Sequence, residues 1–207
     1  MELEEKNAKE RKELMHYLLD YLKRREINAT IKQESSINPL GMRISESIIH
    51  LTDQNINNIR ITGLGSGGCG LPGNIMRFQY EINLDKKLSS EDIKNIKAST
   101  QIIKEGKLMN LFGGEIVGIE WKGKRLANIL NQDNSITDDL MRCVKSWSSL
   151  EYQIEAATPF NINIIGPRFT DPRKIAQIYK SGIKEEIECC VFGYKTVDRI
   201  AVHIKEI

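Results

Sequence analysis

The stretch IMRFQYEINL, residues 75–84, carries an apolar side chain at every even-numbered position. The odd-numbered positions from Arg77 to Asn83 are all polar. A period of two is that of a β-strand, whose successive side chains point to opposite faces of a sheet. The stretch therefore predicts a strand whose apolar face packs against the core; that face consists of Met76, Phe78, Tyr80, Ile82 and Leu84.

Other segments on both sides of this strand are also predicted to be strands, and the first three of them are short, alternate partly and are bounded by Asn, Pro or Gly. They are INATIKQE (27–34), GMRISESI (41–48), NNIRIT (57–62), GEIVGIEW (114–121), LEYQIEA (150–156) and FNINIIG (160–166). The last two are expected to form a hairpin or two consecutive strands across Thr158-Pro159.

Four other regions have the spacing of helices. Residues 3–25 place Leu14, Leu18 and Leu22 four residues apart, with Met15 and Leu19 beside them. SSED (89–92) and Ser135-Ile-Thr-Asp138 both have the S-x-x-D form of a helix start. The first opens a short helix through Ile96, and the second opens an apolar stripe of Ile136, Leu140, Val144 and Trp147. A further short helix is expected through Leu126, Ile129 and Leu130.

Asp171-Pro172 predicts one more helix start, because Asp caps a helix and Pro suits its first position. Its buried stripe would be Ile175, Tyr179, Ile183 and Ile187. The final segment DRIAVHIKEI (198–207) fits both periods. Ile200, Val202 and Ile204 suit a strand, and we favour that interpretation over a helix.

Helices separated by runs of strands predict an α+β protein with a largely antiparallel sheet, an N-terminal helix and two to four further helices. A strand pair followed by a helix recurs at residues 57–97 and 150–188. We expect one compact unit over residues 1–207. The recurrence also leaves open two similar halves, 1–105 and 106–207, although no residue-level repeat supports that division.

Composition and charge narrow the class of protein. The 30 basic and 28 acidic residues give a net charge of +2, which is weaker than a dedicated duplex-binding domain usually shows. The acidic start is unlike a secretory signal, and no stretch is long and apolar enough to span a membrane. The cysteines form no C-x-x-C motif, so reduced thiols in the cytoplasm are expected; they are Cys69, Cys143, Cys189 and Cys190.

The glycine-rich stretch GLGSGGCGLPG (63–73) formally contains G-x-G-x-x-G after a predicted strand. A dinucleotide fold needs a helix at the third glycine, and the chain instead enters the strand at Ile75. No lysine lies between Lys32 and Lys86, which argues against a P-loop. The loop therefore connects two strands. An alternative hypothesis is that successive backbone amides of the loop form an anion-binding nest, flanked by two arginines. The candidate residues of this anion site are Arg60, Gly63, Gly65, Ser66, Gly67, Gly68 and Arg77.

Two basic turns suggest a second alternative, nucleic-acid binding, because each combines cations with an aromatic residue at a predicted helix start. We favour the interpretation that the aromatic residues belong to the core and that the charges are solvated. The candidate residues are Trp121, Lys122, Lys124, Arg125, Arg168, Arg173 and Lys174.

The sequence shows no catalytic motif, and it predicts neither a metal site nor a cofactor. His16, His50 and His203 lie far apart, near no cysteine or carboxylate pair with metal-ligand spacing. The best interpretation is a cytoplasmic, non-catalytic binding or interaction protein. The Leu/Met face of the N-terminal helix would either dock on the chain's own sheet or contact a protein partner or a second copy. A ligand site or an active site under the glycine-rich loop and nucleic-acid binding remain the alternatives.

Overall fold

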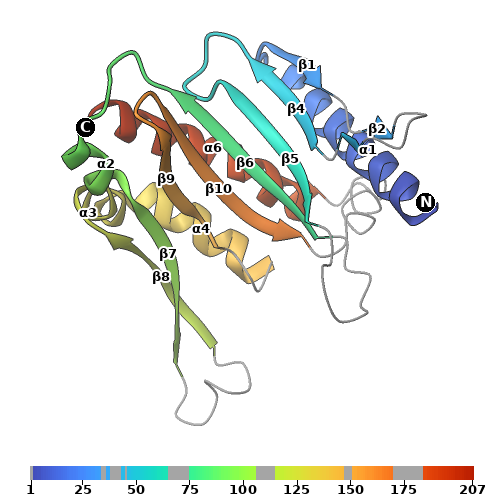
Figure 1. Ribbon diagram of the computed structural model, residues 1–207. Helices are drawn as coiled ribbons and strands as arrows, with labels where there is room; N and C mark the ends of the chain where they lie inside the picture. Colours follow the sequence, from blue (N-terminus) through green and yellow to red (C-terminus); the bar gives the residue numbers. More distant parts are fainter. Residues whose placement is uncertain are drawn as a thin grey trace.

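The computed structural model describes residues 2–33, 36–37, 43–44, 46–64, 75–105, 115–146, 151–169 and 184–207 (Figure 1). Eight strands form one sheet in the order β1-β4-β5-β6-β10-β9-β7-β8. All the neighbouring strands pair antiparallel. The strands are β1 Ala29–Gln33, β4 Glu46–Leu51, β5 Asn58–Leu64, β6 Ile75–Asn83, β7 Ala98–Glu105, β8 Glu115–Gly123, β9 Gln153–Thr158 and β10 Asn161–Phe169. A separate ribbon pairs β2 Ser36–Ile37 with β3 Arg43–Ile44.

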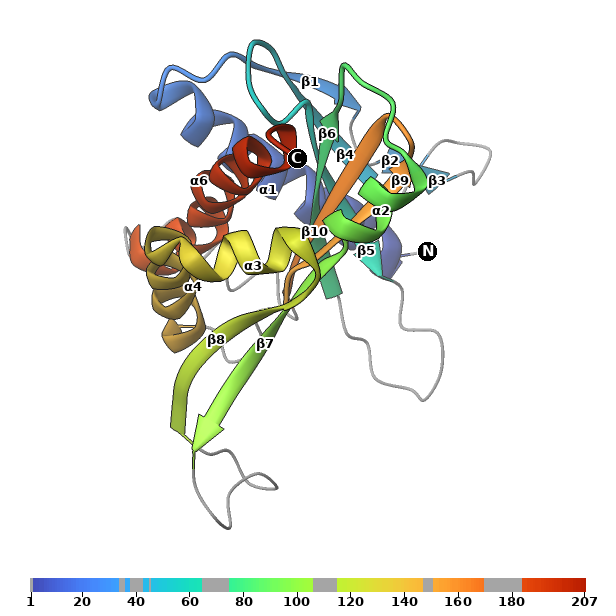
Figure 2. The same cartoon turned by 90° about the vertical axis from the view of Figure 1, so that its left-hand side faces the viewer.

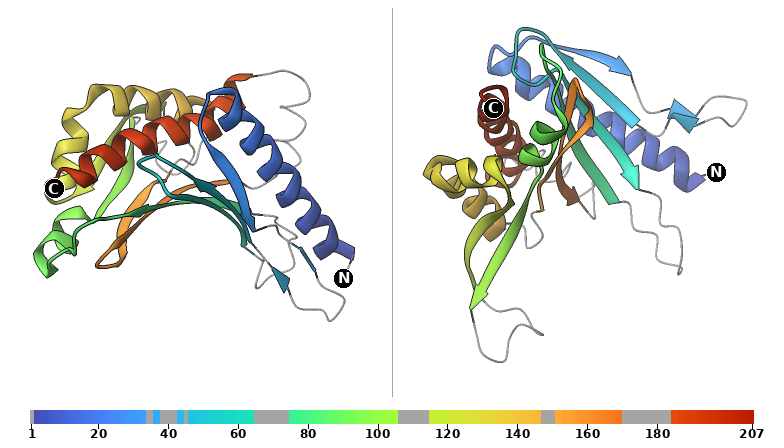
Figure 3. Two further views of the ribbon diagram at one scale, coloured as in Figure 1. Left: turned by 90° about the horizontal axis from the view of Figure 1, so that it is seen from above. Right: turned by 60° about the vertical axis from the view of Figure 1, so that its left-hand side comes forward.

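The helices of the described residues are α1 Glu2–Arg24, α2 Ser90–Ile96, α3 Arg125–Gln132, α4 Asn134–Ser146 and α6 Lys184–Lys205. The predicted α+β class with an antiparallel sheet and an N-terminal helix is confirmed. In Figures 2 and 3, α4 and α6 lie on one side of the curved sheet, and α1 lies beside them. The short α2 lies at the end of the sheet, next to α3 and β9. The helices therefore leave the other face of β5, β6 and β10 uncovered in the described part of the chain.

The core fills the space between the sheet and the helices. Phe78, Tyr80 and Ile82 of β6 are buried there, as the alternation predicts, and Leu84 is partly buried. The side chain of Met76 lies outside the described residues. The apolar face of α1 is also buried in this core. Of the two roles expected for that face, docking on the chain's own sheet is therefore the one that the structure has. That face consists of Leu14, Met15, Leu18, Leu19 and Leu22.

The last segment of the chain is a helix, and the expectation of a strand there is wrong. α6 continues to Lys205 and buries Val197, Ile200, Ala201 and Ile204 at helical spacing. A strand would have placed Val202 on the same face as Ile200 and Ile204, yet Val202 is 39% exposed. Packing against the other helices and the sheet selects the helical period, because only that period buries all four side chains together.

Two further features differ from the expectations. The sequence pattern did not predict strand β7, because the adjacent apolar residues Ile102 and Ile103 break the alternation that marks a strand. The N-terminus of α4 is capped by Asp133 rather than Ser135: the Asp133 Oδ1 atom accepts from the backbone N–H of Ser135 at 3.0 Å and of Ile136 at 3.3 Å. The helix expected after Asp171 lies outside the described residues as far as residue 183.

The end of β8 depends on a glycine. Gly123 has φ of 154°, and a Cβ atom there would lie 2.4 Å from the carbonyl oxygen of Lys97. From the second turn of α3, the Asn131 side chain binds the outer edge of β8. Its Oδ1 accepts from the Trp121 N–H at 2.7 Å, and its Nδ2 donates to the Trp121 carbonyl at 2.9 Å. A neighbouring strand would make the same two hydrogen bonds to the backbone of Trp121. The Asn131 side chain therefore prevents another strand from pairing with this part of the β8 edge.

Candidate functional site on the helix-free face

The structure brings together part of the predicted anion site. Strands β5 and β6 pair from Asn58↔Glu81 to Leu64↔Ile75, so the glycine-rich loop connects two adjacent antiparallel strands. Arg60 and Arg77 lie on the same face of this hairpin, because Arg60 is opposite Gln79. Gly63 lies in β5. The remaining candidates, Gly65, Ser66, Gly67 and Gly68, lie outside the described residues, and the anion site stays a prediction.

Arg60 is held between two carboxylates. Its guanidinium donates to Glu81 Oε1 from Nε at 2.9 Å and from Nη2 at 2.5 Å, and to Glu46 Oε2 from Nη1 at 2.5 Å. The Glu81 side chain is only 12% exposed. Burial lowers the pKa of Arg60, but its hydrogen bonds to Glu46 and Glu81 raise it more, so the net pKa is raised. A phosphate would have to displace these carboxylates to bind Arg60.

The same network fixes the orientation of His50. Asn58 Nδ2 donates to Glu81 Oε2 at 2.8 Å, and Asn58 Oδ1 lies 3.1 Å from His50 Nδ1. Because an amide oxygen can only accept, the proton of this second bond is on His50 Nδ1. The imidazole of His50 is therefore held by its Nδ1 atom, and the residue is exposed. Glu46, Arg60, Glu81, Asn58 and His50 together form what we call the polar network.

The polar network belongs to rows of side chains that cross the helix-free face. Directly opposed residues share a face of an antiparallel sheet, so the strand register defines these rows. The first row is Thr30, His50, Asn58, Glu81, Asn163 and Glu155. The second is Gln33, Ile48, Arg60, Gln79, Ile165, Gln153, Ser99 and Lys122. Six of the eight members of the second row, all but Ile48 and Ile165, and all six of the first are polar, so this face is suited to hydrogen bonding.

Asn163, in the middle of the first row, has a buried Oδ1 atom with no hydrogen-bond partner among the described residues. A buried acceptor without a donor costs free energy. Water or a donor from a bound molecule would remove that cost. Its neighbours across the strands, Glu81 and Glu155, are both carboxylates and therefore supply no donor when ionised.

The first basic turn does not present its aromatic ring to solvent. Trp121 is 3% exposed, and its ring centroid lies 6.5 Å from that of Tyr152, which agrees with the favoured core interpretation. Lys122 pairs with Glu120 at 2.6 Å. Lys124 and Arg125 are exposed. The side chain of Arg168, and the whole of Arg173 and Lys174, lie outside the described residues, so the second basic turn stays untested.

A second charged cluster joins α6 to the turn between α3 and α4, and sequence reasoning missed it. Asp133 accepts from Ser135 Oγ at 2.6 Å and contacts His203 Nε2 at 3.0 Å. The His203 and Ser135 bonds, with those of the Ser135 and Ile136 amides, outweigh burial and lower the pKa of Asp133 to about 2. A catalytic triad places the histidine next to the serine. Here the aspartate lies between them, so the cluster caps α4 and anchors α6.

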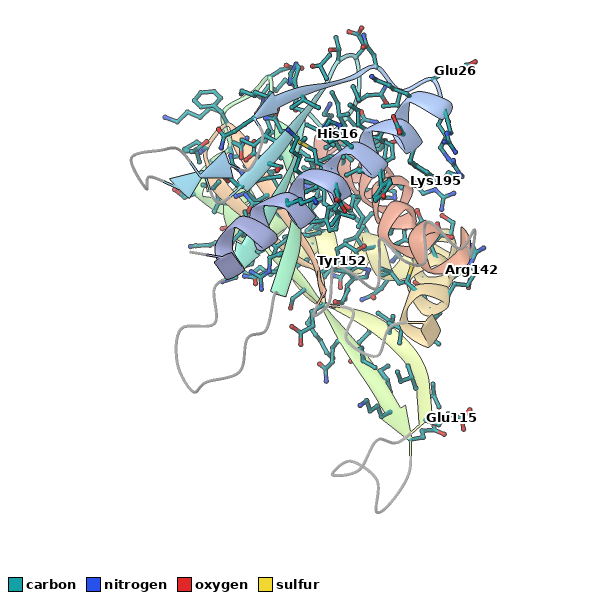
Figure 4. The ribbon with its side chains drawn as sticks, turned by 90° about the vertical axis from the view of Figure 1, so that its right-hand side faces the viewer. His16, Glu26, Glu115, Arg142, Tyr152 and Lys195 are labelled. Atoms are coloured by element: carbon teal, nitrogen blue, oxygen red, sulfur yellow. The ribbon has the colours of Figure 1, made fainter. Side chains whose placement is uncertain are left out.

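Strands β7 and β8 extend beyond the rest of the sheet as a two-stranded arm, visible at the bottom of Figures 1 and 2. Figure 4 shows Glu115 at its far end, well away from Tyr152 in the core. The arm exposes Ile103 by 40% and Val117 by 42%. These are two of the four exposed large apolar residues in the described part of the chain; the others are Phe160 and Val202.

Comparison of the chain with protein-family models, curated protein sequences and solved structures finds no match. In the described ranges no helix combines the length and the apolar character that a membrane crossing requires. Within those same ranges no group of three His, Cys, Asp or Glu side chains is arranged to hold a metal ion.

Proposed function

We propose that this chain is a non-catalytic interaction protein that binds a partner protein with the helix-free face of its sheet. The observation that carries the proposal is the distribution of the layers. The helices pack on one face, and two rows of polar side chains cross the other (Figure 3). The hydrogen bonds that join Arg60 to Glu46 and Glu81 fix these three side chains before a partner arrives, and such preorganisation lowers the entropic cost of association.

The class of partner follows from the chemistry of this face. Single-stranded nucleic acid is bound by exposed aromatic rings together with unpaired cations. Among the described residues of the two rows there is no Phe, Tyr or Trp, the one imidazole, that of His50, is hydrogen-bonded to Asn58, and Arg60 and Lys122 are each paired with a carboxylate. Amides and paired charges suit the mixed donors and acceptors of a protein surface.

The N-terminal helix takes a different role in this proposal from the one expected from sequence. Its Leu/Met face is buried against the chain's own sheet. Using that face for a partner would require undocking α1 and exposing Met15 and Leu22, which are fully buried. We therefore assign partner binding to the sheet and an intramolecular role to α1.

We also propose a cytoplasmic location, on the evidence of the cysteines, which form no C-x-x-C motif. Cys143 is a buried thiol on α4. Titration of the denatured chain without reductant should detect four thiols, and electrophoretic mobility should be the same with and without reductant. A native disulfide would contradict the proposed location.

The interaction is tested by a photoreactive amino acid placed in the full chain in cells. Gln153, exposed in the second row of the helix-free face, is the test position, and Val202, exposed on α6 in the helix layer, is the control. The proposal expects adducts to another protein from position 153 and few from position 202. Glu155→Arg, which adds a long charged side chain next to the test position, should reduce the adducts. Equal labelling from both positions, or none from 153, would contradict the proposal.

A further inference from the structure

The far part of the arm has an apolar surface that its own strands leave uncovered. Ile103 lies opposite Gly118, and a Cβ atom at Gly118 would lie 3.4 Å from Ile103 Cδ1. That distance leaves room for a small side chain, and the φ of Gly118 is outside the left-handed region. Neither space nor backbone conformation requires glycine here. Because glycine contributes no side chain, the outer surface of Ile103 stays exposed.

Acidic side chains flank this apolar surface on the same face. Glu105 lies two residues beyond Ile103 on β7, and Glu115 lies directly opposite Glu105. Val117 is two residues from Glu115, at the point where the register shifts by one residue. Residues two apart on a strand share a face. Ile103, Val117, Glu105 and Glu115 therefore form one surface, which we call the arm patch.

Among the described residues of the arm, the two charges of the arm patch have the same sign and lie opposite each other. Like charges directly opposite each other on neighbouring strands repel. The adjacent cation, Lys104, lies opposite Ile116 and so belongs to the other face of the arm. The patch thus carries two negative charges, although the whole chain carries +2. A cation placed between the two glutamates would remove the repulsion.

We propose that the arm patch docks a protein surface on which an apolar side chain stands next to Lys or Arg. The apolar group would cover Ile103 and Val117, and the cation would lie between Glu105 and Glu115. The arm patch continues the face that carries Ser99 and Gln101, because these residues alternate with Ile103 along β7. The inference therefore rests on the proposed function and names the partner chemistry for one end of the same face.

The test uses two synthetic amphipathic peptides of equal length, one of Leu and Lys and one of Leu and Glu, titrated into the purified full chain. General attraction by a chain of charge +2 would favour the Leu–Glu peptide. The proposal expects the Leu–Lys peptide to bind at least about ten-fold more tightly, with an affinity that falls as salt rises.

Variants locate the binding. Replacing both Ile103 and Val117 with serine should weaken Leu–Lys binding about ten-fold or more. Replacing Glu105 and Glu115 with glutamine should weaken it about three-fold and reduce its salt dependence. Val202→Ser, at a position of similar exposure on α6, is the matched control and should bind as wild type does.

The proposal is wrong if neither peptide binds, if the two bind alike, or if the Val202 control loses as much affinity as the arm variants. It is also wrong if the arm variants, with unchanged melting temperatures, bind like wild type. These outcomes leave the crosslinking result at Gln153 unaffected, so failure of the arm chemistry and failure of the proposed function are distinguishable.

Discussion

Replacing Asp133 with asparagine should reduce stability in a way that depends on pH. The pKa of this carboxyl is about 2 in the folded chain, against an ordinary value of 3.8. At about 1.4 kcal/mol per pH unit, this difference corresponds to about 2.5 kcal/mol. The side chain is 24% exposed, so solvent screens part of the interaction and we expect about 1–2 kcal/mol.

The direction of the pH dependence follows from the lowered pKa. Folding favours the ionised carboxylate, so its contribution is complete above about pH 4 and is lost as the pH falls towards about 2. Asparagine keeps an oxygen that can accept from the amides of Ser135 and Ile136, but it removes the charge. Asp133→Asn should therefore be less stable than wild type at pH 7, and the difference should shrink to about a third of that value at pH 2.5.

The assay is urea unfolding of both proteins at pH 7, 4, 3 and 2.5, with Asp85→Asn at an exposed bend as the control. The control should differ little from wild type at every pH. A difference between wild type and Asp133→Asn that is the same at pH 7 and pH 2.5 would show that shape, and not charge, gives Asp133 its role. No difference at pH 7 would refute the reasoning altogether.

Three further substitutions test the packing, each by urea unfolding. Leu18→Asp puts a charge into the core and should cost about 2–4 kcal/mol; an unchanged midpoint would mean that α1 is not docked. Gly123→Ala should cost about 1–3 kcal/mol because the new methyl group meets a backbone carbonyl, whereas Gly118→Ala should be tolerated; equal effects would contradict the close approach. Asn131→Ala leaves two peptide groups of Trp121 without their partner and should cost about 1–3 kcal/mol, and a neutral result would mean that water replaces the amide.

The class of fold could be predicted because local patterns decide it. The alternation in residues 75–84 gives both the strand β6 and its buried face, and the capping box of α2 at Ser89 and Asp92 is present as its sequence indicates. Leu14, Leu18 and Leu22 of α1 are buried, as their spacing predicts. Each of these features depends on side chains within one element, so the sequence of that element is sufficient.

The elements that escaped prediction depend on contacts from distant parts of the chain. Residues 198–205 fit a strand and a helix equally well by themselves, and packing of α6 decides between them. β7 has a weak pattern of its own and is stabilised by pairing with β8 and β9.

The candidate site was harder still to foresee. Arg60 and Glu81 are separated by 21 residues and Asp133 and His203 by 70. Only the register of the hairpin, or the packing of two helices, brings such side chains together. The alternating polar positions of β6 do predict an uncovered face, but they do not identify which neighbours share it.

The position of β10 has a consequence for how the chain acquires its structure. This strand, residues 161–169, lies between β6 and β9 and joins the two parts of the sheet. Its pairing with β6 brings together Asn161 and Asn83, 78 residues apart. During synthesis the ribbon β4–β5–β6 can close from nearby segments, but the sheet stays in two pieces until β10 has left the ribosome. Because closing such a long loop is slow, we expect formation of the β6–β10 ladder to limit the folding rate, with β6 exposing an unpaired edge until then.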